Sequence, residues 1–180
     1  NYFKYCFLKA TGLEFEEERL EDDFDRMADV LLQGREETFM YRDFQSRNIM
    51  LKNGEPYYID FQGGKRGPLM YDVASVLYQA KAKFSEKLRN ELFDSYIAAL
   101  QTVIPADREL LFKQFKLFAL VRTLQVLGAY GFRGYYEKKK HFIESIPAAV
   151  KNLKDLLALK FINLPYIEAI ASKIDIAEPA

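Results

Sequence analysis

The stretch from Tyr41 to Leu77 reads YRDFQSRNIMLKNGEPYYIDFQGGKRGPLMYDVASVL and decides the fold. Two β-type runs, residues 48–51 and 57–61, lie on either side of Lys-Asn-Gly-Glu at 52–55. Asn-Gly is the strongest short signal for a two-residue hairpin turn. Pro56 begins the returning strand, where a missing N–H is tolerated. The sequence therefore predicts a small β-hairpin.

Polar residues stand at the open end of this hairpin. Arg47 and Asn48 lead into the first strand, and Asp60 lies at the end of the second. A two-residue turn brings them to the same end, but a slip or bulge of one residue decides whether Arg47 or Asn48 faces Asp60. Asp43 lies five residues before Asn48, on the incoming loop.

These side chains suit one kind of chemistry. The amide oxygen of Asn48 and the carboxylate of Asp60 are hard oxygen ligands, which Mg²⁺ prefers together with phosphate oxygens and water. A further carboxylate, Asp43, is placed to accept a proton from a hydroxyl nucleophile. Phosphoryl transfer needs both parts, a metal ion that neutralises phosphate charge and a group that orients the attacking oxygen.

The rest of the chain predicts helices. Gly34, Pro105 and Gly128 are expected to end three of them, and a shorter helix is expected from about 73 to 83 with Asp72 as its N-cap. The fold class is therefore mostly α with a small β-hairpin. Apolar stripes with helical periodicity lie at residues 24–31, 88–104, 117–127 and 143–157.

Composition excludes several functions. The 180 residues carry 26 basic and 26 acidic side chains, so no global positive field exists to bind nucleic acid or an anionic membrane. One cysteine, Cys6, and one histidine, His141, exclude a disulfide framework, a cysteine-based zinc site and a multi-histidine metal site. The sequence shows no apolar run of about 20 residues and no signal peptide, so a cytoplasmic location is expected.

The stretch resembles the catalytic core of the aminoglycoside phosphotransferase and choline kinase family, a branch of the protein-kinase-like fold. That family has the pattern H-x-D-x-x-x-x-N, then a hairpin, then I-D-F, then a segment similar to D-L-A. The chain also resembles the bacterial kinases that phosphorylate amino sugars at the anomeric carbon. The similar motifs are R-D-F-x-S-R-N, D-F-Q and G-P. The matching blocks are Arg42 to Asn48, Ile59 to Gln62, and Tyr71 to Leu77.

The resemblance implies a role for each matching residue. Asp43 orients or deprotonates the acceptor hydroxyl, and Asn48 and Asp60 hold Mg²⁺ with ATP. Asp72 accepts backbone N–H groups and braces the catalytic loop.

Three positions depart from the family pattern. One is Gln62, where the pattern after the metal-site aspartate has glycine, a difference that the amino-sugar subgroup shares. Tyr41 stands where the family has a histidine, which is usually structural, so an aromatic ring is expected to fill the same space. Gln45 stands two residues after Asp43, where related kinases often place a cation or a histidine. Arg47 or Arg42 is expected to supply that positive charge near the transferred phosphate.

The resemblance also implies a domain organisation. The chain corresponds to the C-terminal lobe of the fold, with leading helices at 1–40, the catalytic loop, hairpin and metal motif at 41–77, and a helical subdomain at 78–180. The N-terminal lobe, with its Gly-rich loop and strand lysine, has no counterpart in residues 1–40 and is expected to be absent. It is therefore an expected partner, and the ATP site of these 180 residues is expected to be incomplete.

The expected function is ATP- and Mg²⁺-dependent phosphoryl transfer to a hydroxyl of a small molecule, with a sugar or amino sugar as the leading acceptor. A choline- or aminoglycoside-type acceptor is the alternative within this class. A catalytically idle, kinase-like binding module is the alternative from another class. The absent lobe, Tyr41 and Gln45 favour the idle module, whereas the intact Asp43, Asn48 and Asp60 favour the enzyme.

Overall fold

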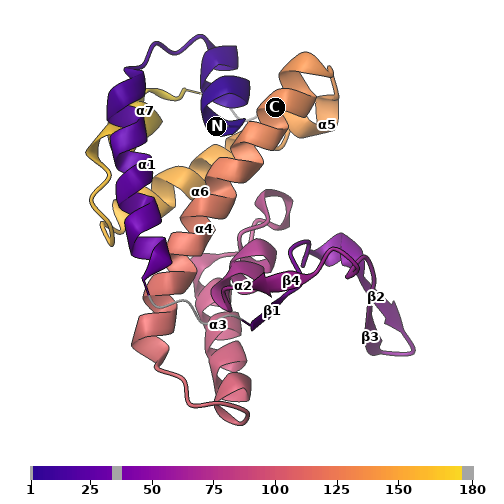
Figure 1. Cartoon of the computed structure of the whole chain (residues 1–180). Coiled ribbons are helices and arrows are strands. Elements are labelled where there is room, and N and C mark those ends of the chain that lie inside the picture. Colours follow the sequence, from indigo (N-terminus) through magenta and orange to yellow (C-terminus); the bar gives the residue numbers. More distant parts are fainter. Residues whose placement is uncertain (1, 34–37, 176–180) are drawn as a thin grey trace. The chain divides into compact units, whose positions relative to one another are not determined.

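A computed structural model describes residues 2–33 and 38–175 and is mostly helical, as the sequence predicts (Figure 1). The chain divides into two compact units: unit 1 comprises residues 1–33 and 120–180, and unit 2 comprises residues 34–119. No helix in the described part of the chain combines the length and apolar character needed to cross a bilayer. The helices are α1 (Glu17–Leu32), α2 (Met70–Leu77), α3 (Glu86–Gln101), α4 (Arg108–Gly131), α5 (Lys140–Ile143), α6 (Ile146–Ala158) and α7 (Pro165–Lys173); the strands are β1 (Thr38–Met40), β2 (Ile49–Lys52), β3 (Glu55–Tyr58) and β4 (Lys65–Gly67).

The predicted hairpin is confirmed as the antiparallel pair β2–β3 of unit 2, which extends away from α2 and α3 in Figure 1. Asn53 and Gly54 form its turn with φ angles of 54° and 83°. A type I′ turn requires positive φ at both central residues, and this explains the preference for Asn-Gly. The turn sets the register, with Lys52 opposite Glu55 and Ile49 opposite Tyr58.

A second antiparallel ribbon, β1–β4, was not predicted. It pairs Thr38 with Gly67 and Met40 with Lys65, so residues 65–67 form a strand. Strands of three residues are too short to show an alternating pattern. In the sequence, β1 precedes and β4 follows the β2–β3 hairpin and the polar residues at its open end.

Unit 2 has an aromatic core between α3 and the first part of α4. Phe93 and Phe115 are fully buried and stack with centroids 5.0 Å apart. Phe112 meets Phe93 edge-on at 5.2 Å, and Tyr78 packs against Phe115 at 5.7 Å. Burial of these rings stabilises the helices that support α2.

The C-terminal end of α2 is held by buried cations. Arg89 Nε of α3 donates to the Leu77 carbonyl at 3.1 Å, which satisfies an acceptor that a helix end leaves open. Lys116 Nζ of α4 donates to the Tyr78 hydroxyl at 3.0 Å and to Glu86 at 2.5 Å. These bonds place α2 relative to α3 and α4.

Several predicted helix ends are wrong. Helix α2 covers residues 70–77 rather than 73–83, and Asp72 lies inside its first turn instead of capping it. Helix α3 begins after Ser85, whose hydroxyl accepts the Leu88 N–H at 3.2 Å, and ends at Gln101, before Pro105. The expected stop at Gly34 lies outside the described residues.

Helix α4 continues past Gly128, where the sequence predicted its end. A Cβ atom at Gly128 would lie 2.6 Å from the Tyr2 carbonyl carbon, and one at Gly131 would lie 2.1 Å from the Cys6 oxygen. Real Cβ atoms do not approach other atoms so closely. These glycines therefore allow the N-terminal segment to pack on α4 within unit 1.

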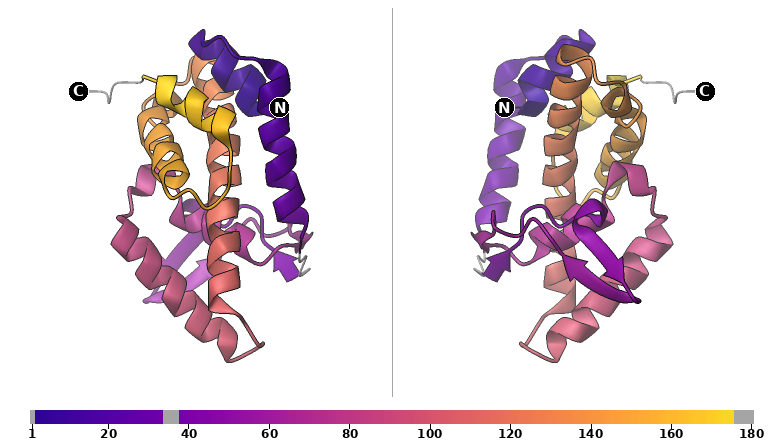
Figure 2. Two further views of the ribbon diagram at one scale, coloured as in Figure 1. Left: turned by 90° about the vertical axis from the view of Figure 1, so that its left-hand side faces the viewer. Right: turned by 90° about the vertical axis from the view of Figure 1, so that its right-hand side faces the viewer.

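Unit 1 is closed by a contact between distant parts of the chain. Asp23 of α1 is fully buried, and its Oδ2 accepts the N–H groups of Tyr166 and Ile167, both at 2.8 Å. These groups lie in the first turn of α7, where a carboxylate is favourable. Helix α7 lies beside α1 in Figure 1, and the left view of Figure 2 shows that α7 begins at its end nearer α1.

Candidate active site

Asn48 is the central residue of the candidate site. It ends a 3₁₀ turn, Ser46–Asn48, and only 6% of its surface is exposed. Its Nδ2 donates to the Asp43 backbone oxygen at 2.9 Å, and its own carbonyl accepts the Ile59 N–H at 3.0 Å. Asn48 therefore joins the loop that carries Asp43 to the strand end that carries Asp60.

The register answers the question that the sequence left open. The ladder ends at the pair Ile49–Tyr58, and Arg47 lies in the 3₁₀ turn before it, so the ladder pairs neither Arg47 nor Asn48 with Asp60. Asn48 instead bonds to the residue immediately before Asp60. The hairpin thus brings Asn48 and Asp60 to the same end through the backbone bond between Ile59 and Asn48.

Asp72 holds the other end of the loop. Its two carboxylate oxygens accept the N–H groups of Tyr41, at 2.6 Å, and Arg42, at 2.9 Å. Arg42 has a φ of 78°, so the chain turns sharply there. A helical carboxylate that binds two successive N–H groups fixes this turn and sets the direction in which the loop leaves β1.

Tyr41 ties the loop to the segment before Asp60. Its hydroxyl donates to the Ile59 carbonyl, and its ring meets Phe44 edge-on at 5.5 Å. Partial burial raises the pKa of the Tyr41 phenol, and the charges of the carboxylates at 60, 43 and 72 raise it further. The phenol therefore stays protonated and remains a donor near neutral pH.

Asp60 has a constrained backbone and a partner for its side chain. Its φ of 67° lies in the left-handed region, which few residues other than glycine adopt. Gln62 Nε2 donates to Asp60 Oδ1 at 2.7 Å. Gln62 belongs to the D-F-Q match, and no pattern in the sequence predicts this contact with Asp60.

The two arginines of the loop bond to neighbouring backbone and amide groups. Arg42 Nη1 donates to the Gly63 oxygen at 3.1 Å, which adds a tie between the loop and the segment after Asp60. Gln45 accepts from Arg47 Nε at 3.3 Å and Nη2 at 3.1 Å when its amide oxygen faces the guanidinium. Arg47 and Asp43 are both exposed.

The donor atoms fit a magnesium ion. Asn48 uses its amide nitrogen on Asp43, so its oxygen is the atom able to face a cation, and Asp60 offers a carboxylate. Within residues 2–33 and 38–175, no three His, Cys, Asp or Glu side chains form a metal-binding group. Mg²⁺ commonly binds one or two protein oxygens plus phosphate and water, so a pair is sufficient.

Comparison with known proteins identifies the family of the chain. The pattern of the phosphotransferase enzyme family, APH, matches residues 8–110. The chain belongs to this family. The matched range contains Asp43, Asn48, Asp60 and Asp72.

The relatives of this APH-family chain include bacterial amino-sugar kinases. It is 29% identical to the N-acetylmuramate/N-acetylglucosamine kinase of Neisseria meningitidis over 119 residues. These aligned residues cover 64% of this chain and 36% of that protein. It is 26% identical over 156 residues to the kinase of the same name from Pseudomonas aeruginosa, and this alignment covers 83% of this chain and 46% of that kinase. The Pseudomonas putida kinase is 25% identical over 111 residues, covering 60% and 33%. The chain thus spans between a third and a half of these relatives.

An aromatic hollow of about 540 Å³ adjoins the candidate site of this APH-family chain. Most of its large side chains are exposed: Phe39 by 68%, Phe61 by 59% and Tyr57 by 54%. A contiguous exposed apolar surface of this kind marks a contact site for another molecule or domain. Its lining comprises Phe39, Tyr41, Phe44, Pro56, Tyr57, Tyr58 and Phe61.

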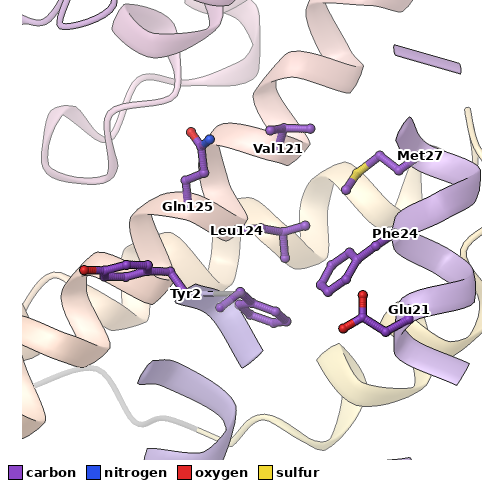
Figure 3. A pocket seen from close by; sticks show the side chains of 8 residues that line it. Tyr2, Glu21, Phe24, Met27, Val121, Leu124 and Gln125 are labelled. Atoms are coloured by element: carbon purple, nitrogen blue, oxygen red, sulfur yellow. The ribbon is translucent and has the colours of Figure 1, made fainter. Parts of the chain in front are cut away.

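A second hollow, of about 510 Å³, lies within unit 1 (Figure 3). Phe24 of α1 points toward Leu124 of α4 across it. Its acidic side chain, Glu21, forms an ion pair with Lys4. Its walls are formed by Tyr2, Phe3, Glu21, Phe24, Met27, Val121, Leu124 and Gln125.

Proposed function

We propose that the complete protein transfers the γ-phosphoryl group of ATP to a hydroxyl of an amino sugar. The observation that carries this proposal is the contact of Asn48 with both Asp43 and the segment of Asp60. The names of the bacterial relatives favour an amino-sugar acceptor over choline or an aminoglycoside. The anomeric hydroxyl is the proposed position, and the cytoplasm, where ATP is plentiful, is the proposed location.

The proposed roles follow from the chemistry of each side chain. Asp43, exposed on its loop, orients the acceptor hydroxyl and accepts its proton. Asn48 and Asp60 hold Mg²⁺, which neutralises charge on the phosphates when it is bound. Asp72 keeps the loop in place through the backbone of Tyr41 and Arg42.

Arg47 is proposed to supply positive charge to the transferred phosphate. It is exposed, and it lies in the 3₁₀ turn immediately before Asn48. Its contact with Gln45 holds the guanidinium beside the loop. An arginine can make bidentate bonds to phosphate oxygens, which suits this role.

An N-terminal lobe is the proposed partner of the aromatic hollow. The curated relatives are two to three times longer than the parts that match this chain. The exposed rings around the catalytic loop, Phe39, Tyr57 and Phe61, offer an apolar surface for such a lobe. The lobe would also supply nucleotide contacts through its Gly-rich loop and strand lysine.

An activity assay tests the proposal. The complete protein is incubated with ATP, Mg²⁺ and N-acetylglucosamine or N-acetylmuramate, and the product is examined by ³¹P NMR. We expect a sugar phosphate whose phosphorus couples to the anomeric proton. Faster turnover of choline or an aminoglycoside would refute the acceptor class, and no ATP-dependent product from a folded protein would favour the idle binding module.

A further inference from the structure

Tyr41 contacts the segments on both sides of the candidate site. It lies two residues before Asp43, and its ring packs against Phe44, the residue after Asp43. Its hydroxyl donates to the carbonyl of Ile59, which belongs to the peptide bond leading into Asp60. A single side chain thus connects the backbone near one carboxylate with the backbone near the other.

The peptide bond before Asp60 needs this support. Asp60 has a φ of 67°, a conformation that is unfavourable for a residue with a Cβ and persists only when surrounding contacts impose it. On one side of residue 59, the N–H of Ile59 is held by the Asn48 carbonyl at 3.0 Å. On the other side, the Ile59 carbonyl is held by the Tyr41 hydroxyl.

We propose that the Tyr41 hydroxyl is a positioning group, which holds the Asp60 backbone in its left-handed conformation and so aligns the Asp60 carboxylate with Asn48. This inference rests on the proposed function, because it assigns the alignment to metal binding. It differs from the expectation that the ring merely fills the space of a histidine. The hydroxyl, and not the ring, is the part that acts.

Tyr41→Phe separates these two possibilities. It keeps the ring and its contact with Phe44 and removes only the hydroxyl. Tyr58→Phe is a matched control, because Tyr58 also packs against Phe44, at 5.9 Å, and lies at the end of β3, next to Ile59. Both variants keep the volume of the aromatic surface.

The first measurement is amide hydrogen exchange on the 180-residue chain. Loss of one hydrogen bond weakens local structure by a small amount, so we expect the Ile59 N–H to exchange roughly threefold to tenfold faster in Tyr41→Phe. The amide of Lys52, near the turn, should be unchanged. Unchanged exchange at Ile59 would overturn the inference, because the hydroxyl would then hold nothing.

The second measurement distinguishes positioning from a merely structural bond. Removal of a group that orients a metal ligand typically lowers metal affinity by about 10- to 100-fold. We expect Mn²⁺, followed by its paramagnetic broadening of the Asn48 and Asp60 amides, to bind at least about tenfold more weakly to Tyr41→Phe. Tyr58→Phe should bind Mn²⁺ as the wild type does. Faster exchange at Ile59 with unchanged Mn²⁺ affinity would overturn the positioning role.

The third measurement uses the complete enzyme. Tyr41→Phe should lower kcat roughly tenfold and leave KM for the amino sugar within about twofold. A variant whose KM rises while its kcat stays unchanged would contradict the inference. If the wild type phosphorylates no acceptor, the proposed function fails, and the exchange and Mn²⁺ measurements still decide the role of Tyr41.

Discussion

Asp43 is the residue whose removal should affect the proposed chemistry most directly. Asp43→Asn keeps the size of the side chain and removes the proton acceptor. General-base assistance contributes about 10²- to 10⁴-fold, so we expect kcat of the complete enzyme to fall by that factor, with a smaller change in KM. Steady-state kinetics measures both values.

A thermal melt serves as the control for Asp43→Asn. Asp43 is exposed, so its substitution should leave the melting temperature nearly unchanged. A variant that melts normally and keeps its full kcat would show that another group accepts the proton. The roles proposed for the other residues of the catalytic loop would then also be contradicted.

Lys4 should make the stability of unit 1 depend on pH. Its buried side chain donates to Glu17 at 2.6 Å and also pairs with Glu21. The bond from Lys4, followed by one from Tyr5, lowers the pKa of Glu17, and the carboxylates raise the pKa of Lys4. A depressed carboxyl pKa stabilises the fold above the ordinary value of about 4.3, and this contribution is lost as the pH falls through the lower, folded-state value.

The comparison of wild type with Lys4→Met tests this dependence. We expect the wild type to melt at a higher temperature near pH 7 and to lose that advantage below about pH 4. Lys151→Met is a control, because Lys151 pairs with Asp155 on the exposed surface of α6, and such pairs contribute little. A difference between wild type and Lys4→Met that is the same at pH 7 and pH 3 would contradict the pairing.

At the scale of elements, the link between α2 and the catalytic loop is open to a direct test. Asp72→Asn leaves one oxygen acceptor for two N–H groups, so either Tyr41 or Arg42 loses its partner. Bonds to a charged acceptor contribute about 1.5–3 kcal/mol, so at least one of these amides should exchange tenfold faster or more. Hydrogen exchange read by NMR measures each amide.

Asp94→Asn is a suitable control for Asp72→Asn. Asp94 lies exposed on α3 and pairs with Arg108, so its substitution removes the same charge from unit 2. The amides of Tyr41 and Arg42 should exchange as in the wild type. Equal effects of the two substitutions would mean that the loop responds to charge rather than to the two hydrogen bonds.

The hairpin was predictable because its determinants are local. Asn53 and Gly54 dictate the turn, and the turn sets the register of β2 and β3. The ribbon β1–β4 was not predictable, because its three-residue strands pair across a long stretch of chain. Local signals also misled at Gly128, which resembles a helix end but serves a close contact with the Tyr2 backbone.

The candidate site, too, was predictable where its signals are local and not where its contacts join distant residues. The spacing of Asp43, Asn48 and Asp60 was visible in the sequence, and the structure adds the contacts that Asn48 makes with their segments. The hydrogen bonds of Asp72 and Tyr41 join residues 31 and 18 positions apart, so no local pattern reveals them. The local pattern at Asp72 predicted a helix cap, which is wrong, whereas the family resemblance implied that Asp72 accepts backbone N–H groups, as it does from Tyr41 and Arg42.

For the whole molecule, the exposed hairpin and the absence of net charge favour self-association. The chain carries 26 basic and 26 acidic residues, so little repulsion keeps copies apart. Leu51 is 76% exposed on β2. We expect Leu51→Lys to reduce self-association, measured by light scattering against concentration, with an unchanged melting temperature.

Leu110→Lys controls for the added charge. Leu110 is 54% exposed on α4 and lies far from the hairpin in the sequence. If the apolar surface drives association, Leu51→Lys should reduce the scattering more than Leu110→Lys does. Equal reductions would assign the effect to net charge alone.

The bond between Asp23 and the first turn of α7 has a consequence for synthesis on the ribosome. Asp23 and Ile167 are separated by 144 positions, and the whole of unit 2 is made between them. Unit 2 is one continuous stretch, so it can fold while the chain is still growing, as domains commonly do. The buried carboxylate of α1 must wait for α7 to emerge. Premature termination anywhere before residue 167 therefore leaves α1 without the N–H groups that its Asp23 binds.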